Sequence, residues 1–415
     1  MSDNNQSKPD GYFLKGNTSK VLINNKSSYN NYINPFGLES YFLKKKEESI
    51  DLGIRLEKII DTRFGWLYEK DYETLKKINV PLYDYNNVNA YYNGLVPSSK
   101  SSLVIEKERI IELQLEYNLS SLSDVISDLT ELRKLSLYRN FLKDLPDSIK
   151  GLTMLKELDL SSNFLKKYPK IINEITSLNT LKLTFNKLES IPQNVNNLKK
   201  LKYLDLNYNQ LYYLPEEIGE LTNLEGLYLD KSKRSKIMIP TTLGDLINLK
   251  VLSLRGNDIT RLPSAILKLI NLEVLNLNEN LFKKIPKSIY KLKNLKELDL
   301  SWNQLSDLPE EINKLSKIEV LNIDSNNLVT LPNIKGLTKL RGLNISATCL
   351  SELPDYISEL TELEVLNASF NKLNSLPNSI EELTNLKKLM LSDNKLDQNE
   401  KNRIKQSLPN CDITF

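Results

Sequence analysis

The chain contains no histidine and only two cysteines among its 415 residues. The missing imidazole excludes Ser-His and Cys-His nucleophile pairs, zinc sites built on histidine, and histidine-based pH switching. The two cysteines, Cys349 and Cys411, are too few and too far apart to make a disulfide framework. This usage is typical of reducing compartments, so we expect a cytoplasmic protein.

The common signatures of enzymes and of membrane insertion are missing too. No Gly-Lys pair occurs, which excludes a G-x-x-x-x-G-K-[ST] phosphate loop, and there is no G-x-S-x-G elbow. No apolar run approaches the roughly 18 residues of a membrane span. The polar start, Met1–Asn5, lacks the pattern of a signal peptide, which a start trimmed for expression would hide. We expect no cofactor, no metal site and no membrane span.

A strong charge of one sign is also absent. The 56 Lys and Arg residues nearly balance the 53 Asp and Glu residues, which leaves a net charge of +3. Nucleic-acid binding depends on clustered neutralisation of phosphates, so this balance argues against a nucleic-acid binder. With 40% apolar and 26% charged residues, the composition is globular.

What the sequence does have is a repeat. The pattern L-x-x-L-x-L-x-x-N-x-L-x-x-L-P-x-x-I-x-x-L recurs from Ile110 to Leu396, as in "LKELDLSWNQLSDLPEEINKL", which begins at Leu295. Most units are 23 residues long, and the thirteen units begin at Ile110, Leu132, Leu155, Leu178, Leu201, Leu224, Leu249, Leu272, Leu295, Ile318, Leu340, Leu363 and Leu386.

Each unit predicts a short strand, a turn and a short helical segment. The alternating L-x-L is a strand with one buried face, and one unit cannot bury its apolar residues without its neighbours. Proline in the L-P slot fixes φ and removes a donor, so the outer side cannot extend a sheet. Segments such as "EEIGEL" after it are expected to form short helical turns.

The asparagine of each unit follows the strand, where its amide can bond backbone groups of the adjacent turn. Two units replace it, with Ser232 and Thr348, whose hydroxyls can do part of this work. The predicted structural ladder comprises Asn118, Asn140, Asn163, Asn186, Asn209, Asn257, Asn280, Asn303, Asn326, Asn371 and Asn394.

These motifs resemble the leucine-rich repeat family over about Ile110 to Leu396. The 23-residue L-P-x-x-I-x-x-L variety is similar to the intracellular class related to Ras-binding scaffolds and to many bacterial repeat proteins. The resemblance implies an α/β solenoid, a horseshoe with a parallel concave β-sheet, that binds proteins through that sheet.

The flanking segments have their own patterns. Residues 1–35 are rich in Asn, Ser and Lys and are interpreted as a flexible polar tail. Residues 36–109 predict a small helical N-terminal cap region, with a short helix over Glu73–Lys77, although a separate recognition module with Trp66, Tyr91 and Tyr92 as exposed anchors is an alternative. Units fill residues 110–396, and residues 397–415 resemble a C-terminal cap made of a helix and a final strand.

Three positions of each unit project from the strand away from the core, and carboxylates prevail there. The acidic residues are Glu112, Glu116, Glu157, Asp159, Asp205, Asp230, Glu297, Asp299 and Asp324; the basic ones are Lys134, Lys182, Arg255 and Lys388. Such a face would steer a partner of opposite charge.

Aromatic side chains add a second signal, because they are frequent among binding hot spots. Single exposed aromatics are also normal on protein surfaces. The predicted partner-binding residues are Tyr138, Glu157, Asp159, Phe185, Tyr203, Asp205, Tyr208, Tyr228, Asp230 and Trp302.

One basic cluster, Lys231, Lys233, Arg234 and Lys236, interrupts the repeat where two residues are inserted. It is interpreted as a solvated loop at the end of a strand rather than as a contact with an acidic partner.

Together these features predict a non-catalytic, monomeric scaffold that binds a protein with a basic surface through its concave face. The alternative is an effector-type protein with an unrecognised activity in its N-terminal 105 residues.

Overall fold

A computed structural model describes residues 18–21, 69–78, 102–106, 109–116, 119–232 and 237–415. The chain divides into two units, Met1–Asp159 and Leu160–Phe415, which are described in turn. No helix in these described ranges is long and apolar enough to span a bilayer. Several residues singled out from the sequence lie outside the described ranges, namely Trp66, Tyr91, Tyr92, Asn118, Lys233, Arg234 and Lys236.

Ahead of the repeats, the described residues of the first unit include two strands, β1 and β2, where the sequence predicted a flexible tail and a helical cap. Strand β1 pairs antiparallel with β2, and β2 pairs antiparallel with β3, which belongs to the first repeat. From β3 onward the pairing is parallel. The polar composition around β1 gave no sign of a strand, because that strand is defined by its pairing with β2. The strands are β1 (Thr18–Val21), β2 (Ser102–Glu106), β3 (Arg109–Gln114), β4 (Lys134–Ser136) and β5 (Glu157–Asp159).

Helix α3 (Glu69–Ile78) covers the start of the first repeat, and it contains the short helix predicted over Glu73–Lys77. Its Asp71 is fully buried and accepts hydrogen bonds from Arg109 Nε at 3.2 Å and from the backbone N–H of Ile110 at 2.8 Å. A buried carboxylate needs such partners. Leu75 of the same helix is also fully buried. The helix therefore acts as a cap for the first repeat, which begins at Ile110.

The second unit carries a parallel sheet in which successive strands pair in register, leucine beside leucine. Helix α4 (Gln398–Ser407) and β16 form the predicted end of the repeat array. Its strands are β6 (Thr180–Lys182), β7 (Tyr203–Asp205), β8 (Gly226–Tyr228), β9 (Val251–Ser253), β10 (Val274–Asn276), β11 (Glu297–Asp299), β12 (Val320–Asn322), β13 (Gly342–Asn344), β14 (Val365–Asn367), β15 (Lys388–Met390) and β16 (Asp412–Thr414).

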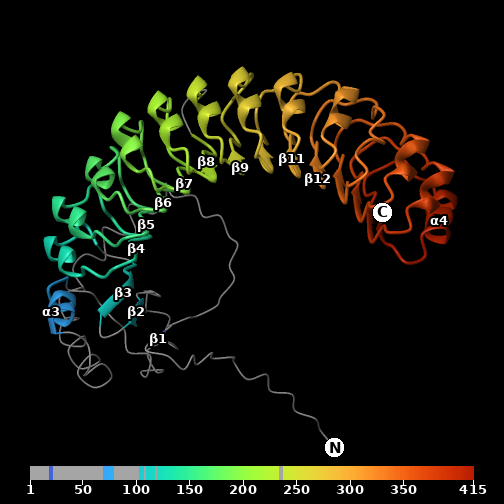
Figure 1. Cartoon of the computed structure of the whole chain (residues 1–415). Helices are drawn as coiled ribbons and strands as arrows, with labels where there is room; N and C mark the ends of the chain where they lie inside the picture. Colours follow the sequence, from blue (N-terminus) through green and yellow to red (C-terminus); the bar gives the residue numbers. More distant parts are fainter. Residues whose placement is uncertain (1–17, 22–68, 79–101, 107–108, 117–118, 233–236) are drawn as a thin grey trace, which may run out of the picture. The chain divides into compact units, whose positions relative to one another are not determined.

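Within Leu160–Phe415 the strands line the inner side of the curve, and short helices line its outer side (Figure 1). These helices are 3₁₀ turns. In the unit of β11, the C=O of Pro309 accepts the N–H of Ile312, and the C=O of Ile312 accepts the N–H of Leu315. A proline precedes each turn except the first, Asp124–Asp128, which follows Ser123. The donor that proline lacks is not needed at this place.

The 3₁₀ turns are η4 (Asp124–Asp128), η5 (Asp147–Gly151), η6 (Lys170–Glu174), η7 (Gln193–Asn197), η8 (Glu216–Glu220), η9 (Thr241–Asp245), η10 (Ser264–Lys268), η11 (Lys287–Lys291), η12 (Glu310–Lys314), η13 (Asp355–Glu359) and η14 (Asn378–Glu382). The unit that begins at Ile318 has 22 residues and no 3₁₀ turn within the described ranges. Its shorter segment after Pro332 leaves one residue too few for the five-residue turn.

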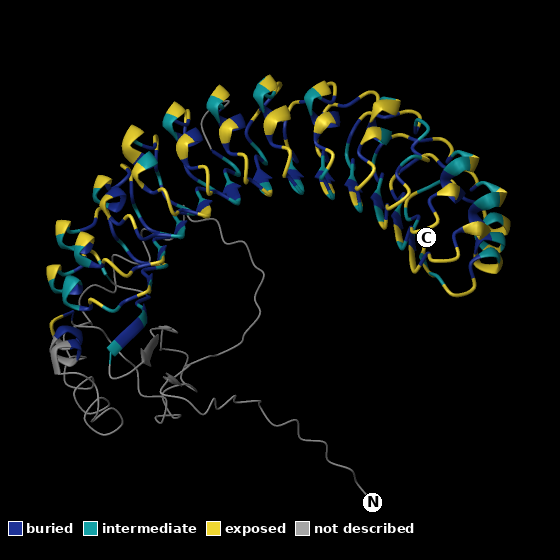
Figure 2. Ribbon diagram, in the orientation of Figure 1, coloured by how far each residue is buried: buried dark blue, intermediate teal, exposed yellow. Residues whose placement is uncertain are grey.

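Buried residues recur along the ribbon in each repeat (Figure 2). The leucines and isoleucines of the repeat make up most of this buried core. In the unit of β11, Leu298 and Leu300 are 1% and 0% exposed, and Ile312 of η12 is 0% exposed. Burial of each such side chain contributes up to about 1.5–3 kcal/mol. The predicted repeat architecture, with parallel strands inside and helical turns outside, is confirmed in Met1–Asp159 and in Leu160–Phe415, each taken by itself.

The asparagines form the expected ladder of buried amides. Nδ2 of Asn303 donates to the C=O groups of Leu277 and Leu300, both at 3.0 Å, and its Oδ1 accepts the N–H of Phe282 at 3.0 Å. One side chain thus satisfies backbone groups of two successive repeat units. Asn140, within the first unit, makes the same set of bonds.

The two replacements behave differently from each other. The Thr348 hydroxyl donates to the C=O of Ile345 at 2.7 Å and so takes over one asparagine bond. The Ser232 hydroxyl is buried and has no hydrogen-bond partner among the described residues. The expectation that both hydroxyls would serve is therefore right for Thr348 and wrong for Ser232.

We expect Asn303→Ala to lower the free energy of unfolding by about 1–3 kcal/mol, because it strands buried backbone groups. The control is Asn327→Ala, since that exposed side chain makes no hydrogen bond within the described ranges; its cost should stay within about 0.5 kcal/mol. Chemical denaturation measures both. Equal losses would show that the asparagine bonds are not important to stability.

Candidate functional site

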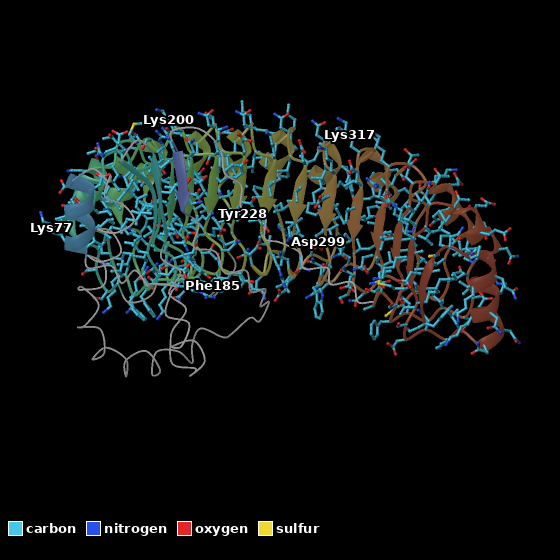
Figure 3. The ribbon with its side chains drawn as sticks, turned by 90° about the horizontal axis from the view of Figure 1, so that it is seen from below. Lys77, Phe185, Lys200, Tyr228, Asp299 and Lys317 are labelled. Atoms are coloured by element: carbon cyan, nitrogen blue, oxygen red, sulfur yellow. The ribbon has the colours of Figure 1, made fainter. Side chains whose placement is uncertain are left out.

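The inner face of Leu160–Phe415 presents side chains in columns, because the strands pair without a shift in register. Each strand directs its first and third residues, and the residue two positions further on, toward the inner face. Beyond them lies a fourth position, immediately before the ladder asparagine, which we call the rim. Tyr228 and Asp299 lie on the inner face, and Phe185 lies at its rim (Figure 3).

Two predicted tyrosines meet across a glycine. Tyr203 of β7 pairs directly with Gly226 of β8. A Cβ on Gly226 would lie 2.8 Å from Cδ1 of Tyr203 and 3.1 Å from Cε2 of Tyr228. The glycine therefore leaves the space into which both rings pack. Tyr203 remains 41% exposed.

Two predicted carboxylates flank these tyrosines, and each is held by hydrogen bonds. Asp205 lies opposite Tyr228 on the next strand and accepts the N–H of Asn207 at 3.0 Å. Asp230 accepts the Ser253 hydroxyl at 2.5 Å and the N–H of Arg255 at 3.0 Å. These bonds fix the carboxylates as part of the surface.

The environment shifts the pKa of two of these groups. Partial burial raises the pKa of the Tyr228 phenol, and the charge of Asp205 adds to the shift. Burial also raises the pKa of the Asp230 carboxyl, although the bonds from Ser253 and Arg255 oppose the rise. Both shifts mark a surface that is already partly shielded from water.

At the rim, Phe185 and Tyr208 stack with ring centroids 4.2 Å apart and an angle of 15° between the planes. The six residues Phe185, Tyr203, Asp205, Tyr208, Tyr228 and Asp230 lie on β6–β8 and the loops after these strands. We call this group the tyrosine cluster.

Every rim residue of the second unit from Ser162 to Asp393 has a positive φ. Only Gly256 at this position is a glycine. The left-handed conformation costs a non-glycine residue about 1–2 kcal/mol. Trp302 and Phe370 occupy it with φ of 51° and 54°, and their side chains are 62% and 61% exposed. Large aromatic residues here gain no burial in exchange for an unfavourable backbone.

The remaining predicted residues are distributed elsewhere. Trp302 follows β11 and is separate from the tyrosine cluster. Tyr138, Glu157 and Asp159 belong to the first unit. There the Arg139 guanidinium lies 5.1 Å from the Tyr138 ring centroid, and Glu157 pairs with Lys134 at 3.0 Å.

The inner face is not uniformly acidic. On β6–β9 and the residues that follow these strands, Asp205 and Asp230 are balanced by Lys182 and Arg255. Glu116, counted as exposed from the sequence, is 6% exposed. In the second unit the excess of carboxylates lies on β11, as Glu297 and Asp299, and just after β12, as Asp324, away from the tyrosine cluster.

A row of alternating charges, not predicted from the sequence, lies at the N-terminal ends of the strands. Glu225 bridges Lys202 and Lys250, at 2.9 Å each, and Glu364 bridges Arg341 and Lys387. Aligning the repeats reveals the alternation, because each of these residues comes immediately before a strand. The full row is Lys202, Glu225, Lys250, Glu273, Lys296, Glu319, Arg341, Glu364 and Lys387.

A second row of asparagines lies beside this ionic row. Asn271 and Asn294 donate to the C=O groups of Ile247 and Ile270, each at 2.8 Å. A shallow hollow here is lined by Lys250, Asn271, Glu273, Asn294, Lys296 and Lys317. Its lysines donate hydrogen bonds within the chain: Lys250 to Glu225, Lys296 to Glu273, and Lys317 to Asn294. We interpret this edge of the sheet as structural. Lys200 and Lys317 lie along it, on the side opposite Phe185 (Figure 3).

In the described part of the chain, no group of three or more His, Cys, Asp or Glu side chains could hold a metal ion.

Comparison with known proteins identifies the repeat. One family model, described as leucine rich repeat, matches residues 176–233, and another, described as leucine-rich repeat region, matches residues 238–327. A solved leucine-rich repeat protein of Leptospira interrogans is 38% identical, with a TM-score of 0.65, over 72% of this chain and 81% of that chain. A search of curated proteins finds no significant match.

Two plant receptors have a similar fold. RGFR1, a peptide hormone receptor solved in complex with RGF2, is 29% identical over 67% of this chain and 46% of its own, with a TM-score of 0.54. The HAESA ectodomain of Arabidopsis, solved with an IDA peptide hormone, is 24% identical over 78% of this chain and 61% of its own, with a TM-score of 0.59. The chain thus spans about half of RGFR1.

The ionic row should make stability depend on pH. Hydrogen bonds from Lys250 and Lys202 lower the pKa of Glu225, and those from Lys387 and Arg341 lower the pKa of Glu364. Because the folded pKa is depressed, this contribution is present above the ordinary value of 4.5 and is lost as the pH falls through the folded pKa.

We therefore expect Glu225→Gln/Glu364→Gln to unfold at lower denaturant concentration than wild type at pH 7. The difference should shrink below about pH 4.5 and at high salt. Glu310→Gln/Glu352→Gln is the control, since both side chains are exposed and form no ion pair within the described ranges. A difference that persists at pH 3 would refute the ionic origin.

Proposed function

Because the chain belongs to the leucine-rich repeat family, we propose that it is a non-catalytic protein that binds a partner protein or peptide on its inner face. The partner is proposed to carry a basic surface. The protein is proposed to act as a monomeric scaffold in the cytoplasm. Its two free cysteines, Cys349 and Cys411, support that location.

The tyrosine cluster is the observation that carries this proposal. A sheet face open to solvent has no packing reason to hold Tyr203 beside Tyr228, with Gly226 left empty between them. Tyrosine supplies a large contact area at a low cost in side-chain entropy, and it is frequent at binding hot spots. The held carboxylates Asp205 and Asp230 require little ordering when a partner binds.

The plant receptor RGFR1 supports the proposal, because its structure includes a bound peptide. HAESA, at 24% identity, supports the fold alone. The Leptospira protein supports the family assignment and suggests no partner.

The alternative is an activity in the N-terminal 105 residues. Capture of partners from lysate by the full chain separates the two. The full chain is needed because Asp71 of α3 bonds the first repeat at Ile110. Capture that survives changes in the tyrosine cluster would favour the alternative.

The decisive change removes the space that Gly226 leaves for the rings. In Gly226→Ala the new methyl group would meet both tyrosines, so the rings must move. Gly342→Ala is the matched control, because it holds the same repeat position and its Cβ meets only Val320 methyl groups at 3.7 Å. We expect Gly226→Ala to weaken binding of the captured partner about tenfold, mostly through faster dissociation.

Tyr203→Ala/Tyr228→Ala should lose at least as much affinity, with the association rate unchanged. Surface plasmon resonance measures both rates. If Gly342→Ala and Gly226→Ala weaken binding equally, the tyrosine cluster is not the contact.

A further inference from the structure

The inner positions of β10–β14, and of the residues two positions beyond each strand, hold no lysine or arginine. Three carboxylates occupy them: Glu297 and Asp299 on β11, and Asp324 just after β12. The nearest rim carboxylate, Glu279, is already paired with Lys231 and Arg255 at 3.1 and 3.2 Å. The negative charge on β11 and β12 is therefore not balanced by the chain's own inner-face cations.

The backbone of Trp302 is paired with the backbone of Asp324. The backbone N–H of Trp302 donates to the backbone C=O of Asp324 at 2.9 Å, which continues the pairing of β11 with β12 as far as the rim. Neighbouring strands are about 5 Å apart, so the backbone that carries the indole lies about one strand spacing from the backbone of Asp324. The side chain is 62% exposed, although tryptophan is a residue that proteins usually bury.

The Asp299 carboxylate is held in place and still has capacity to accept. Its Oδ1 accepts the N–H of Ser301 at 2.9 Å and the Ser301 hydroxyl at 2.5 Å. No bond of its Oδ2 to a described residue is seen, and a carboxylate can accept about four hydrogen bonds. Asp324 is fixed likewise by the hydroxyls of Ser346 and Ser325, at 2.5 and 3.2 Å.

We propose that Trp302, Asp299 and Asp324 form a subsite for an arginine side chain of the partner. This rests on the proposed function, and it assigns recognition of the basic residue to β11 and β12 rather than to the tyrosine cluster. The planar guanidinium stacks on the indole face while its N–H groups donate to the carboxylates. Lysine fits less well, because its compact, strongly hydrated ammonium has no plane to stack on the indole and no pair of parallel N–H groups to donate to a carboxylate.

The repeat supplies conservative variants for the test. Asparagine occupies the position of Asp299 in neighbouring strands, as Asn276 and Asn322, and accepts the equivalent backbone N–H there. Asp299→Asn therefore keeps the turn and removes only the charge. For Trp302→Ser, Ser162 and Ser325 already hold the rim conformation, with φ of 56° and 51°.

Phe370→Ser is the matched control, because Phe370 is an equally exposed rim aromatic that follows β14, a strand whose inner positions hold no carboxylate. A second readout uses the indole itself. The chain has two tryptophans, so Trp66→Phe leaves Trp302 as the sole indole fluorophore.

The probe is a phage-displayed library of random linear peptides, selected on the full chain. We expect the selected peptides to contain arginine and to change the Trp302 fluorescence on binding. Substituting citrulline for that arginine should weaken binding about tenfold, with a smaller loss for lysine. Trp302→Ser and Asp299→Asn/Asp324→Asn should give a similar loss, and Phe370→Ser no loss.

The citrulline comparison uses unchanged protein, so it holds even if a variant folds poorly. Peptides that bind equally well with citrulline, or to Trp302→Ser, overturn the subsite. If those same peptides lose affinity for Gly226→Ala, the proposed function stands without it. Selection of no peptide above background overturns both.

Discussion

The structure depends on one recurring interaction, the bonding of a buried asparagine amide to backbone groups at the end of each strand. The strands of the second unit are only three residues long, too short to hold a sheet together by themselves. Asn303 shows how the problem is solved, because its amide satisfies carbonyls of two successive units. Unsatisfied groups at this depth would cost about 1–3 kcal/mol per unit. With them satisfied, the leucines of neighbouring units can pack in register.

This regularity organises the inner face into columns, and the chemistry of the face follows from which residues share a column. Tyr203 meets the empty position of Gly226 because the two are paired across β7 and β8. The same regularity fixes the rim in a left-handed conformation, so Trp302 there adopts an unfavourable backbone and gains no burial. Residues that break a local preference without a packing benefit are the ones to associate with binding. The residues on its inner face divide the second unit into two distinct surfaces, one aromatic and balanced in charge, the other acidic.

The fold was largely predictable because a repeat multiplies each weak local signal. Strand positions, the ladder asparagines and the prolines before the outer turns all follow from the aligned units. Where the repeat gives way, prediction was poorer. Strands β1 and β2 pair antiparallel in a region expected to be a tail and a helical cap. Ser232 leaves its hydroxyl without a partner among the described residues, whereas Thr348 replaces its asparagine. The outer turns span five residues each and are 3₁₀ rather than α-helical.

The sequence by itself determined the architecture, since period, alternation and turn residues are local properties of each unit. It also indicated which side chains point outward from the strands, because outward positions follow from the strand period. Only the tertiary structure decided how those residues group. Stacking the units set Tyr203 against Tyr228, engaged Asp230 with Ser253, paired Glu279 with Lys231 and Arg255, and left the carboxylates of β11 and β12 without a cation on the same inner face. These outcomes depend on distances between side chains of different units, and a single unit's sequence carries no information about them.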